Sequence, residues 1–440
     1  MNIHSNSGSS LWRESKTIIP GGNQLLSKRS EMFLPDLWPS YYKEARGIEV
    51  WDLDDNHYFD MSIMGIGTCP LGYANEAVNS AVKTAIDKGS MSTLNCHEEV
   101  ELAKKLLELH PWFHQARFAR TGGEACTIAV RTARAATGKD KVAFCGYHGW
   151  HDWYISANID DGSHLNNQLL PGLAPNGVPK VLKGTAIPFH YGQAQELRQI
   201  VDQNLNEIGV IILEVARYKT VDVDFLHEVR DIATEIGAVL IFDEITSGFR
   251  ACPGGMHRLF EIKPDVAVLG KAMGNGYPIA AVVGTSDIME AAQDTFISST
   301  YWTERIGFTA ALEVICQFEE NNVGDYLVKT GKELKVRLQS MFAALSLDIE
   351  VQGLDAGPAI MIKEDDALEI KTVFTQEMLK RGYLASTLIY LSTAHNNENL
   401  DGYLQTAKEV WTTIAAAVRG DSLVSMLEGP ICHSGFKRLT

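Results

Sequence analysis

Short, uniformly apolar runs alternate with amphipathic stretches along the middle of the chain. An apolar run of roughly four to eight residues between polar segments is typical of a strand that is buried on both faces of a sheet. Such strands, connected by helical stretches, predict an α/β fold with a mostly parallel sheet sandwiched by helices. The runs are residues 141–146, 209–214, 238–244, 266–271 and 279–284.

The two ends of the chain show different patterns. Residues 47–62 contain two short alternating runs around an Asp-Asp turn, which predicts a β-hairpin. The stretch 97–110 repeats apolar residues at helical spacing, and further amphipathic stretches occur late in the chain. We therefore predict an N-terminal arm with short strands (1–70), a large domain (71–311), and a C-terminal segment (312–440) that joins the arm in a smaller α+β domain.

Charge and cysteine content narrow the range of functions. With 39 basic and 55 acidic residues, the net charge of −16 has the wrong sign for binding nucleic acid or an anionic membrane. No apolar stretch predicts a transmembrane helix or a secretion signal, and the seven cysteines are scattered. We therefore expect a cytoplasmic protein without a disulfide framework and without a metal site.

Several common catalytic motifs are absent from the sequence. It contains no G-x-x-x-x-G-K-[ST] loop, no complete dinucleotide fingerprint, no H-E-x-x-H helix and no G-x-S-x-G turn. His110 and His114 have the spacing of a metal-binding pair, but Pro111 interrupts a helix between them. We expect both histidines at the surface or in a loop. Phosphoanhydride transfer, nicotinamide chemistry and serine hydrolysis all lose support.

Polar residues at the ends of the apolar runs indicate a different chemistry. Ligands of parallel α/β sheets gather where the strands end, and Glu214, Asp243 and Lys271 each end an apolar run. A lysine in a partly desolvated cleft has its neutral amine favoured, which makes Lys271 a candidate for a Schiff base with a carbonyl, although a lone strand-end lysine more commonly reaches solvent. Asp243 is a buried carboxylate that needs a partner, and a protonated ring nitrogen would pair with it.

Two glycine-containing turns complete this pattern. A Thr-Gly-Gly turn opens a helical stretch and offers the N–H groups of Gly122 and Gly123 to a phosphate, although an ordinary helix cap by Thr121 explains the same residues. Tyr147 and His148 lie between glycines just past a strand, where an aromatic ring stacks on a flat ligand or packs between lobes. The phosphate turn, the ring, the acid and the lysine are together the four parts that pyridoxal 5'-phosphate needs.

These residues make the sequence resemble the class III pyridoxal-phosphate aminotransferases of fold type I, nearest to the glutamate-1-semialdehyde aminomutase branch. The resemblance covers nearly the whole chain. It implies a fold type I transferase and an obligate homodimer with shared active sites, in which Thr300 of the second subunit reaches the cofactor phosphate. The motifs that carry the resemblance are IPGG (19–22), GIEVWDLDDNHYFDM (47–61), TGGEA (121–125), YHG (147–149), LIFDEITSGFR (240–250), LGKAMGNGYPIAAVVG (269–284) and STAHNNENLD (392–401).

The resemblance also implies roles for single residues. Tyr147 would stack on the cofactor ring, Ile245 would pack behind it, and Glu214 would line the site. Asp243 would pair with the pyridine nitrogen, and Lys271 would form the Schiff base and move a proton between carbon atoms. The implied cofactor-binding residues are Gly122, Gly123, Tyr147, His148, Glu214, Asp243, Ile245, Lys271 and Thr300, of which Lys271, Asp243 and Tyr147 are the catalytic ones.

The part of the sequence that would bind the substrate departs from the family. The proline that the family usually has after the strand-end glutamate is Val215 here. A tryptophan of the aminomutase corresponds most nearly to Met64, and a family glutamate falls in the region of Thr387. The arginine that binds the substrate carboxylate corresponds to Lys28 or Arg29. We therefore expect a substrate other than glutamate 1-semialdehyde.

The sequence thus predicts a pyridoxal-phosphate aminotransferase that acts through a Lys271 Schiff base. It would move an amino group from a small-molecule donor to a small or sugar-derived carbonyl acceptor. An intramolecular aminomutase that acts on glutamate 1-semialdehyde or an analogue uses the same core residues, and so does an amino-acid racemase. A cofactor-binding protein without catalysis is a further class, against which the intact Lys271 and Asp243 argue.

Overall fold

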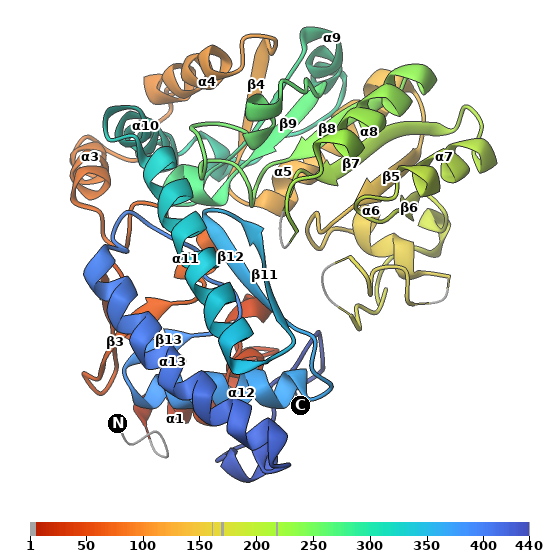
Figure 1. Ribbon diagram of the computed structural model, residues 1–440. Helices are drawn as coiled ribbons and strands as arrows, with labels where there is room; N and C mark the ends of the chain where they lie inside the picture. The colour runs from red at the N-terminus through yellow and green to blue at the C-terminus, as the bar shows by residue number, and fades with distance from the viewer. Residues whose placement is uncertain (1–5, 161, 169–170, 217–218, 440) are drawn as a thin grey trace. The chain divides into compact units, whose positions relative to one another are not determined.

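The computed structural model folds into two compact units (Figure 1). Within the part of the chain that the structure describes, no helix combines the length and the hydropathy that crossing a bilayer requires. The described residues are 6–160, 162–168, 171–216 and 219–439.

The larger unit consists of residues 76–325, and the smaller unit combines residues 1–75 with 326–440. The N-terminal arm and the C-terminal segment therefore build one α+β unit, as the sequence predicted. The boundaries differ from the predicted ones, because helix α10 (Arg305–Glu320) continues past residue 312 within the larger unit.

A seven-stranded sheet forms the centre of the larger unit. Only one of these strands, the neighbour of the edge strand, runs against the others, so the predicted mostly parallel sheet is confirmed. The strands, in their order across the sheet, are β4 (Gln115–Ala119), the reversed strand β10 (Ala280–Gly284), β9 (Val266–Leu269), β8 (Val239–Asp243), β7 (Ile208–Glu214), β5 (Lys141–Cys145) and β6 (Ala186–Pro188).

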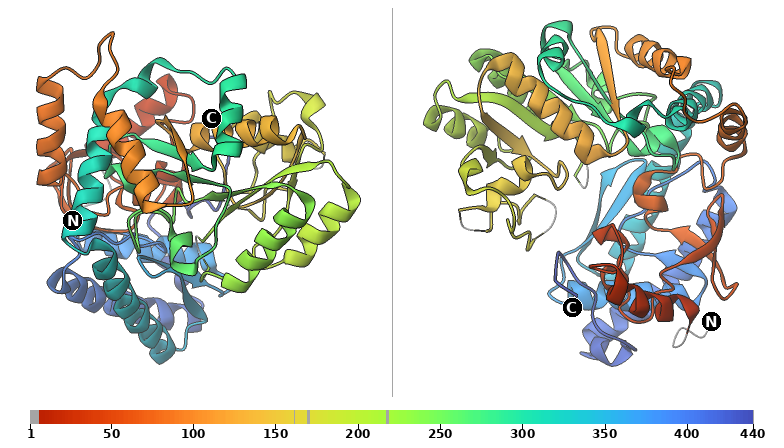
Figure 2. Two further views of the ribbon diagram at one scale, coloured as in Figure 1. Left: turned by 90° about the horizontal axis from the view of Figure 1, so that it is seen from above. Right: turned by 180° about the vertical axis from the view of Figure 1, so that it is seen from behind.

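Side chains of these strands alternate between two apolar cores, one on each face of the sheet. In β7, Val210 and Ile212 pack on one face, whereas Ile211 and Leu213 pack on the other. Both faces are covered by helices, with α5 (Gly122–Thr137) on the face opposite α7 (Ala194–Gln203) and α8 (Val223–Ile236) (Figure 2). Further helices of this unit are α3 (Glu76–Asp87), α4 (His97–Leu109), α6 (Asp152–Ile155) and α9 (Ser286–Met289).

The smaller unit contains a four-stranded sheet and a separate two-stranded hairpin. The predicted hairpin of residues 47–62 is present as two antiparallel strands in which Glu49 lies opposite Phe59. The elements of this unit are α1 (Ser7–Ile18), β1 (Tyr42–Arg46), β2 (Glu49–Asp52), β3 (His57–Met61), α2 (Met64–Gly67), α11 (Val323–Leu345), β11 (Ile349–Leu354), β12 (Gly357–Ile362), α12 (Ala367–Lys380), β13 (Tyr383–Ala385) and α13 (Asn397–Arg419).

His110 lies in a loop, which is one of the two expected alternatives, but it is fully buried, so the surface alternative is wrong for it. It follows the last turn of α4, where its Nδ1 donates to the carbonyl of Leu106 (2.8 Å) and its Nε2 accepts from the N–H of Gly255 (3.1 Å). These bonds fix the neutral tautomer, because a proton on Nε2 would face another N–H group. Burial lowers the pKa of His110 to about 4.

We expect His110 to make the larger unit sensitive to acid. Its pKa in the folded state lies below that of the unfolded chain, so the unfolded chain binds a proton first as the pH falls from 6.5 towards 4. The loss of stability amounts to about 3 kcal/mol when complete. Denaturant unfolding of His110→Asn should therefore depend less on pH between 6.5 and 4.5 than that of the wild type. The exposed His114→Asn is the control, and equal pH dependence of all three proteins would contradict the assignment.

Candidate active site

The carboxyl ends of neighbouring strands bring acidic residues together at one edge of the large sheet. Glu214 ends β7 and Asp243 ends β8, and the two are partners in the parallel register. Both side chains are buried. The strands β5 and β9 end at the same edge, and the chain continues there into Gly146 and Gly270.

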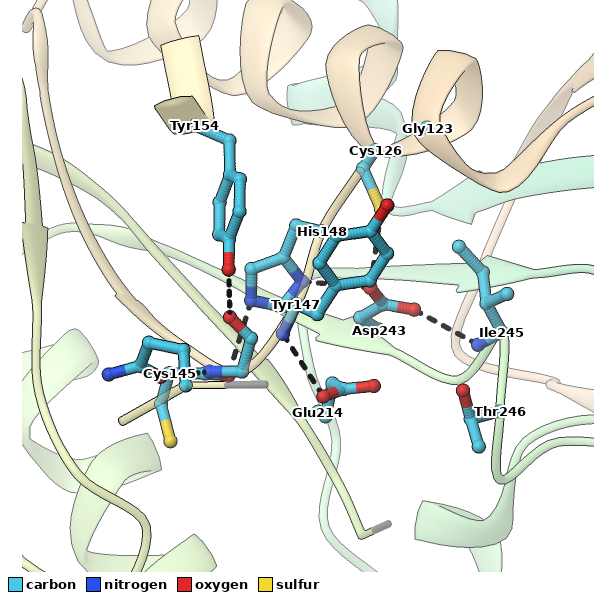
Figure 3. A network of polar contacts seen from close by, with 12 residues as sticks. Gly123, Cys126, Cys145, Tyr147, His148, Tyr154, Glu214, Asp243, Ile245 and Thr246 are labelled. Atoms are coloured by element: carbon cyan, nitrogen blue, oxygen red, sulfur yellow. Dashed lines mark hydrogen bonds and ion pairs between the residues drawn. The ribbon is translucent and has the colours of Figure 1, made fainter. Parts of the chain in front are cut away.

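Asp243 is the centre of a hydrogen-bond network (Figure 3). Its Oδ2 accepts from Nδ1 of His148 (2.8 Å) and from the thiol of Cys126 (3.3 Å), and its Oδ1 accepts from the N–H of Ile245 (3.0 Å). Burial alone would raise the pKa of Asp243, but the hydrogen bond and the charge of His148, with the Ile245 and Cys126 donors, hold it below its ordinary value. The carboxylate is therefore kept ionised inside the protein.

His148 is oriented from both sides. Its Nε2 lies 3.2 Å from the carbonyl oxygen of Cys145, and its Nδ1 lies beside Asp243. Both nitrogens thus face hydrogen-bond acceptors, which fix the orientation of the ring. His148 therefore supports Asp243 from the side of β5.

Cys126 extends this support from helix α5. Burial and the neighbouring Asp243 charge raise the pKa of the Cys126 thiol well above its ordinary value, so the thiol keeps the proton that it donates. Cys126 lies one helical turn after Gly122, which directs both residues to the same face of α5.

Removing the Cys126 thiol should shift the acid limb of the pH–rate profile. In Cys126→Ala, Asp243 loses one donor to its charged form, so its pKa rises and the acid limb of kcat/KM shifts up by about half to one pH unit. Cys126→Ser keeps a donor and should stay near the wild type. Rate profiles of the three proteins test this expectation, which fails if the alanine variant shows no shift or the serine variant shifts equally.

The first turn of α5 forms a glycine-lined cradle. Thr121 caps the helix, and its hydroxyl and Glu124 form a capping box, which leaves the N–H groups of the following glycines directed outward. A Cβ on Gly122 would lie 2.7 Å from the side chain of Ile245, and a Cβ on Gly149 would lie 2.7 Å from the Cα of Gly123. Only glycines permit this close approach.

Gly149→Ala should weaken the binding of a phosphate-bearing cofactor at this turn. Gly149 has a φ of 104°, and an added methyl group would collide with the backbone of Gly123. We expect an affinity for pyridoxamine phosphate that is lower by about 5- to 150-fold, since a shift of this backbone costs roughly 1–3 kcal/mol. Titration calorimetry measures it. Gly138→Ala is the matched control, because Gly138 also has a positive φ but open space around it. Equal affinities in both variants would contradict the expectation.

Tyr147 follows β5 and is tied to β7 through its backbone. Its N–H donates to Oε2 of Glu214 (3.1 Å), and its ring meets the ring of Tyr154 edge to face at 5.7 Å. Tyr154 in turn donates its hydroxyl to the carbonyl of Gly146 (2.9 Å). Gly146 is required here, because a Cβ would lie 2.6 Å from Oε2 of Glu214.

Lys271 follows β9 with a strained backbone. Its φ of 42° lies in the left-handed region, which costs a residue other than glycine roughly 1–2 kcal/mol. The side chain is half-buried, and its Nζ donates to the hydroxyl of Thr246 (2.9 Å). The amine is thus held at the same sheet edge as Asp243.

Only one of the two consecutive carboxylates at the end of β8 belongs to this network. Oε1 of Glu244 accepts from the N–H and from Nδ1 of His257 (2.8 and 2.7 Å). Burial raises the pKa of Glu244, but the bonds from His257 outweigh it and hold the pKa below its ordinary value. Neighbouring side chains of an extended chain point to opposite sides, so Glu244 anchors the turn while Asp243 faces the site.

The structure brings most of the predicted site residues together in the larger unit. Thr300 lies in the same unit but in an exposed 3-10 turn (Thr300–Thr303), and among the described residues no hydrogen bond or ring contact joins it to Asp243. The residues that gather at the sheet edge are Gly122, Gly123, Tyr147, His148, Glu214, Asp243, Ile245 and Lys271.

The predicted substrate residues belong to the smaller unit. Lys28 is exposed, and Arg29 donates to the carbonyl of Lys437 (3.2 Å). Met64 is buried and begins the turn α2, whose four residues all have a positive φ. The carbonyl of Thr387 accepts from the N–H of Ile360 (2.7 Å). Their part in substrate binding stays a prediction.

Three residues of the site were missed by the sequence reasoning. Cys126 had a signal, because it follows Gly122 at the spacing of one helical turn. The only sequence signal for Thr246 was its position three residues after Asp243, because the sequence does not define the path of the turn in which it lies. His151 closes the cradle, with its ring 3.2 Å from a Cβ on Gly123.

Fold and site together define a class of cofactor-binding α/β transferase, and comparisons identify the family. The model of the class III aminotransferases matches residues 35–389, so the chain belongs to this family. The 3-aminobutyryl-CoA aminotransferase of Cloacimonas acidaminovorans is 31% identical over 413 residues, which cover 91% of this chain and 95% of the relative. The 2'-deamino-2'-hydroxyneamine transaminase of Streptomyces kanamyceticus is 30% identical and covers 83% and 90%.

Other relatives and solved structures agree with this assignment. The glutamate-1-semialdehyde 2,1-aminomutase of Archaeoglobus fulgidus is 28% identical over 425 residues, covering 91% of this chain and 98% of the relative. Among solved structures, an omega-transaminase from Sphaerobacter thermophilus superimposes with a TM-score of 0.82 at 20% identity, covering 94% and 98% of the two chains. The predicted fold type I transferase is thereby confirmed.

Pyridoxal phosphate is the cofactor of this family, and the residues at the sheet edge fit it. The cradle of α5 offers N–H groups to a phosphate. Nδ1 of His151 is buried beside it without a hydrogen-bond partner among the described residues, as a phosphate-facing donor would be. Asp243 is an ionised carboxylate that suits a protonated ring nitrogen, and Lys271 offers a primary amine.

Proposed function

We propose that this class III aminotransferase works through Lys271 and Asp243 on pyridoxal phosphate, transferring an amino group from a small donor to a carbonyl acceptor. One observation carries the proposal: the Lys271 amine, the Asp243 carboxylate and the glycine cradle of α5 lie at the same edge of one sheet. That set supplies an amine, a counter-charge and a phosphate site at once.

When bound, pyridoxal phosphate supplies an aldehyde that condenses with primary amines and a ring that accepts the electron pair left by a broken C–H bond. Gly122 and Gly123 would bind its phosphate through their N–H groups. Tyr147 and Ile245 would contact the faces of the ring. Their fixed backbones, tied to Glu214 and Asp243, would orient the cofactor.

Asp243 and Lys271 handle the protons. The Asp243 carboxylate, held ionised by His148 and Cys126, would keep a proton on the ring nitrogen and so preserve the positive charge that draws electrons into the ring. Lys271 would move the proton between the substrate carbon and the cofactor carbon, since its amine is mobile on a four-carbon stem. Glu214 lines the site beside Tyr147 and excludes water there.

We propose a small or sugar-derived carbonyl compound as the acceptor. Two relatives are named for amino transfer involving a 3-aminobutyryl thioester and an aminoglycoside. An aminomutase is the second candidate, supported by a relative of that name. Against it stands Met64, the position nearest to a tryptophan of the aminomutase. The donor carboxylate would be bound by Lys28 or Arg29, and Thr387 would line the substrate side.

The donor is the first thing to measure. The purified protein with pyridoxal phosphate is incubated with single amino acids and amines, and conversion to pyridoxamine phosphate is followed by absorbance and mass spectrometry. In an aminotransferase, a donor alone converts the cofactor to pyridoxamine phosphate. The pyridoxal phosphate form returns only when a carbonyl acceptor is added. If glutamate 1-semialdehyde is isomerised without a second substrate, the aminomutase is correct instead.

We further propose a cytoplasmic homodimer with shared sites, in which the partner subunit's Thr300 reaches the cofactor phosphate. Thr300 is exposed, and the neighbouring Phe296 and Tyr301 are 87% and 69% exposed, which is unusual for such large apolar side chains. None of the seven cysteines, all within the described residues, forms a disulfide, which suits a reducing compartment. Light scattering should give about twice the chain mass of 48.5 kDa, and a monomer mass would contradict the dimer.

A further inference from the structure

Thr246 touches the amine that the proposed reaction uses. Its hydroxyl accepts a hydrogen bond of 2.9 Å from Nζ of Lys271, and the residue is only 2% exposed. The contact joins two separate strand ends, because Thr246 lies in the turn after β8 and Lys271 follows β9. The two residues are therefore brought together by the fold and not by their spacing in the sequence.

The position of this hydroxyl is fixed by its surroundings. The N–H of Glu244 donates to the carbonyl of Val268 (2.8 Å), which ties the start of the turn to β9. The buried Arg250 donates from Nε to the carbonyl of Thr246 (2.7 Å). Thr246 is thus held on both sides, within a turn in which Figure 3 shows Ile245 bonded to Asp243.

A fixed acceptor matters for a lysine. Its side chain has four rotatable bonds, and ordering it costs up to about 2 kcal/mol of rotamer entropy. A hydroxyl oxygen accepts from an ammonium group and rotates to donate to a neutral amine, so it holds Nζ in either protonation state. A hydrocarbon wall would hold the stem of the side chain but not its tip.

We propose that Thr246 is a positioning residue that holds the Lys271 amine ready for the cofactor aldehyde whenever the two are not bonded. The inference rests on the proposed role of Lys271. After the ammonium group has lost a proton to solvent, the nitrogen lone pair forms the C–N bond with the aldehyde carbon. The aldehyde oxygen leaves as water with the two remaining amine protons, and a C=N bond results. By holding Nζ, Thr246 reduces the number of conformations that the lysine side chain samples before this bond forms.

Capture of the cofactor by the full-length apoprotein tests the role. Stopped-flow absorbance gives the second-order rate with pyridoxal phosphate, and borohydride reduction with peptide mapping locates the bond. Thr246→Val keeps the shape but removes the hydroxyl, and capture should be about tenfold slower, the worth of one hydrogen bond. Thr246→Ser should stay within about twofold of the wild type. Pyridoxamine phosphate, which has no aldehyde, should bind with unchanged affinity to both variants.

Ser247→Ala is the matched control, because it removes a neighbouring buried hydroxyl that donates to Glu244 instead of contacting the lysine. This variant should capture the cofactor at the wild-type rate. The inference is overturned if Thr246→Val captures at the wild-type rate, or if its affinity for pyridoxamine phosphate falls as much as its capture rate. If borohydride fails to trap the cofactor on Lys271 in the wild type itself, the proposed function fails instead.

Discussion

Replacing Lys271 by alanine is expected to lower kcat by at least about 1000-fold while the protein stays folded. In the proposed mechanism the amine supplies both the bond to the cofactor and the proton transfer between carbon atoms, and no other lysine or arginine among the described residues is hydrogen-bonded to Asp243. The side chain is half-buried and belongs to neither apolar core of the large sheet, so its loss leaves both cores intact. Pyridoxamine phosphate should still bind, because the cradle of α5 is untouched.

Two measurements define this result. Single-turnover kinetics with pyridoxamine phosphate and a carbonyl acceptor give the rate of proton transfer, and borohydride reduction followed by mass spectrometry should find no cofactor attached to the variant. Lys263→Ala is the control, since Lys263 is an exposed lysine of the same unit. Retention of the reduced adduct in Lys271→Ala would show that a different lysine carries the cofactor.

The sequence predicted the sheet well where burial alone decides the pattern. Strands such as β7 are covered on both faces, so their residues up to the last one are apolar, and these runs are easy to recognise in the sequence. Strands β4 and β6 were not predicted. β4 contributes the polar Gln115 and Arg117 at the edge of the sheet, and β6 has only the three residues Ala186–Pro188. Edge strands such as these lack the length or the uniform apolarity by which a central strand is recognised.

The candidate site was predictable in its strand-end residues but not in the contacts between them. The carboxyl ends of parallel strands meet at one edge, so Glu214, Asp243 and Lys271 could be grouped from their positions alone. Which atoms meet depends on helix phase and on turn geometry, which a single sequence does not define. Cys126 and Thr246 were missed for this reason.

The unpredicted burial of His110 has a related physical cause. Pro111 does end α4, as expected, but the helix end is covered by Phe113 and His257, whose rings lie 5.7 and 5.5 Å from that of His110. The end of a helix is exposed only if no other residues pack on it. His257, which is distant in sequence, therefore contributes to a burial that the residues around His110 do not predict.

Replacing Asp243 by asparagine is expected to lower kcat by about 100- to 1000-fold while leaving cofactor binding largely intact. Asparagine keeps the shape, but it carries no charge to hold the proton on the ring nitrogen, so the ring accepts electrons less readily. The phosphate cradle lies on a different element, α5, and keeps the cofactor in place.

The pH dependence separates this role from a structural one. His148 and Cys126 keep the pKa of Asp243 below its ordinary value, so the wild type should hold its activity until the pH falls through that lowered pKa. Asp243→Asn has no carboxylate to titrate, and its slow residual rate should lose this acid limb. Rate profiles and the nitrogen-15 chemical shift of ring-labelled cofactor report the two effects independently. The exposed Asp231→Asn on α8 is the control. Wild-type turnover in Asp243→Asn would remove the assigned role, because then the ring would need no carboxylate to stay charged.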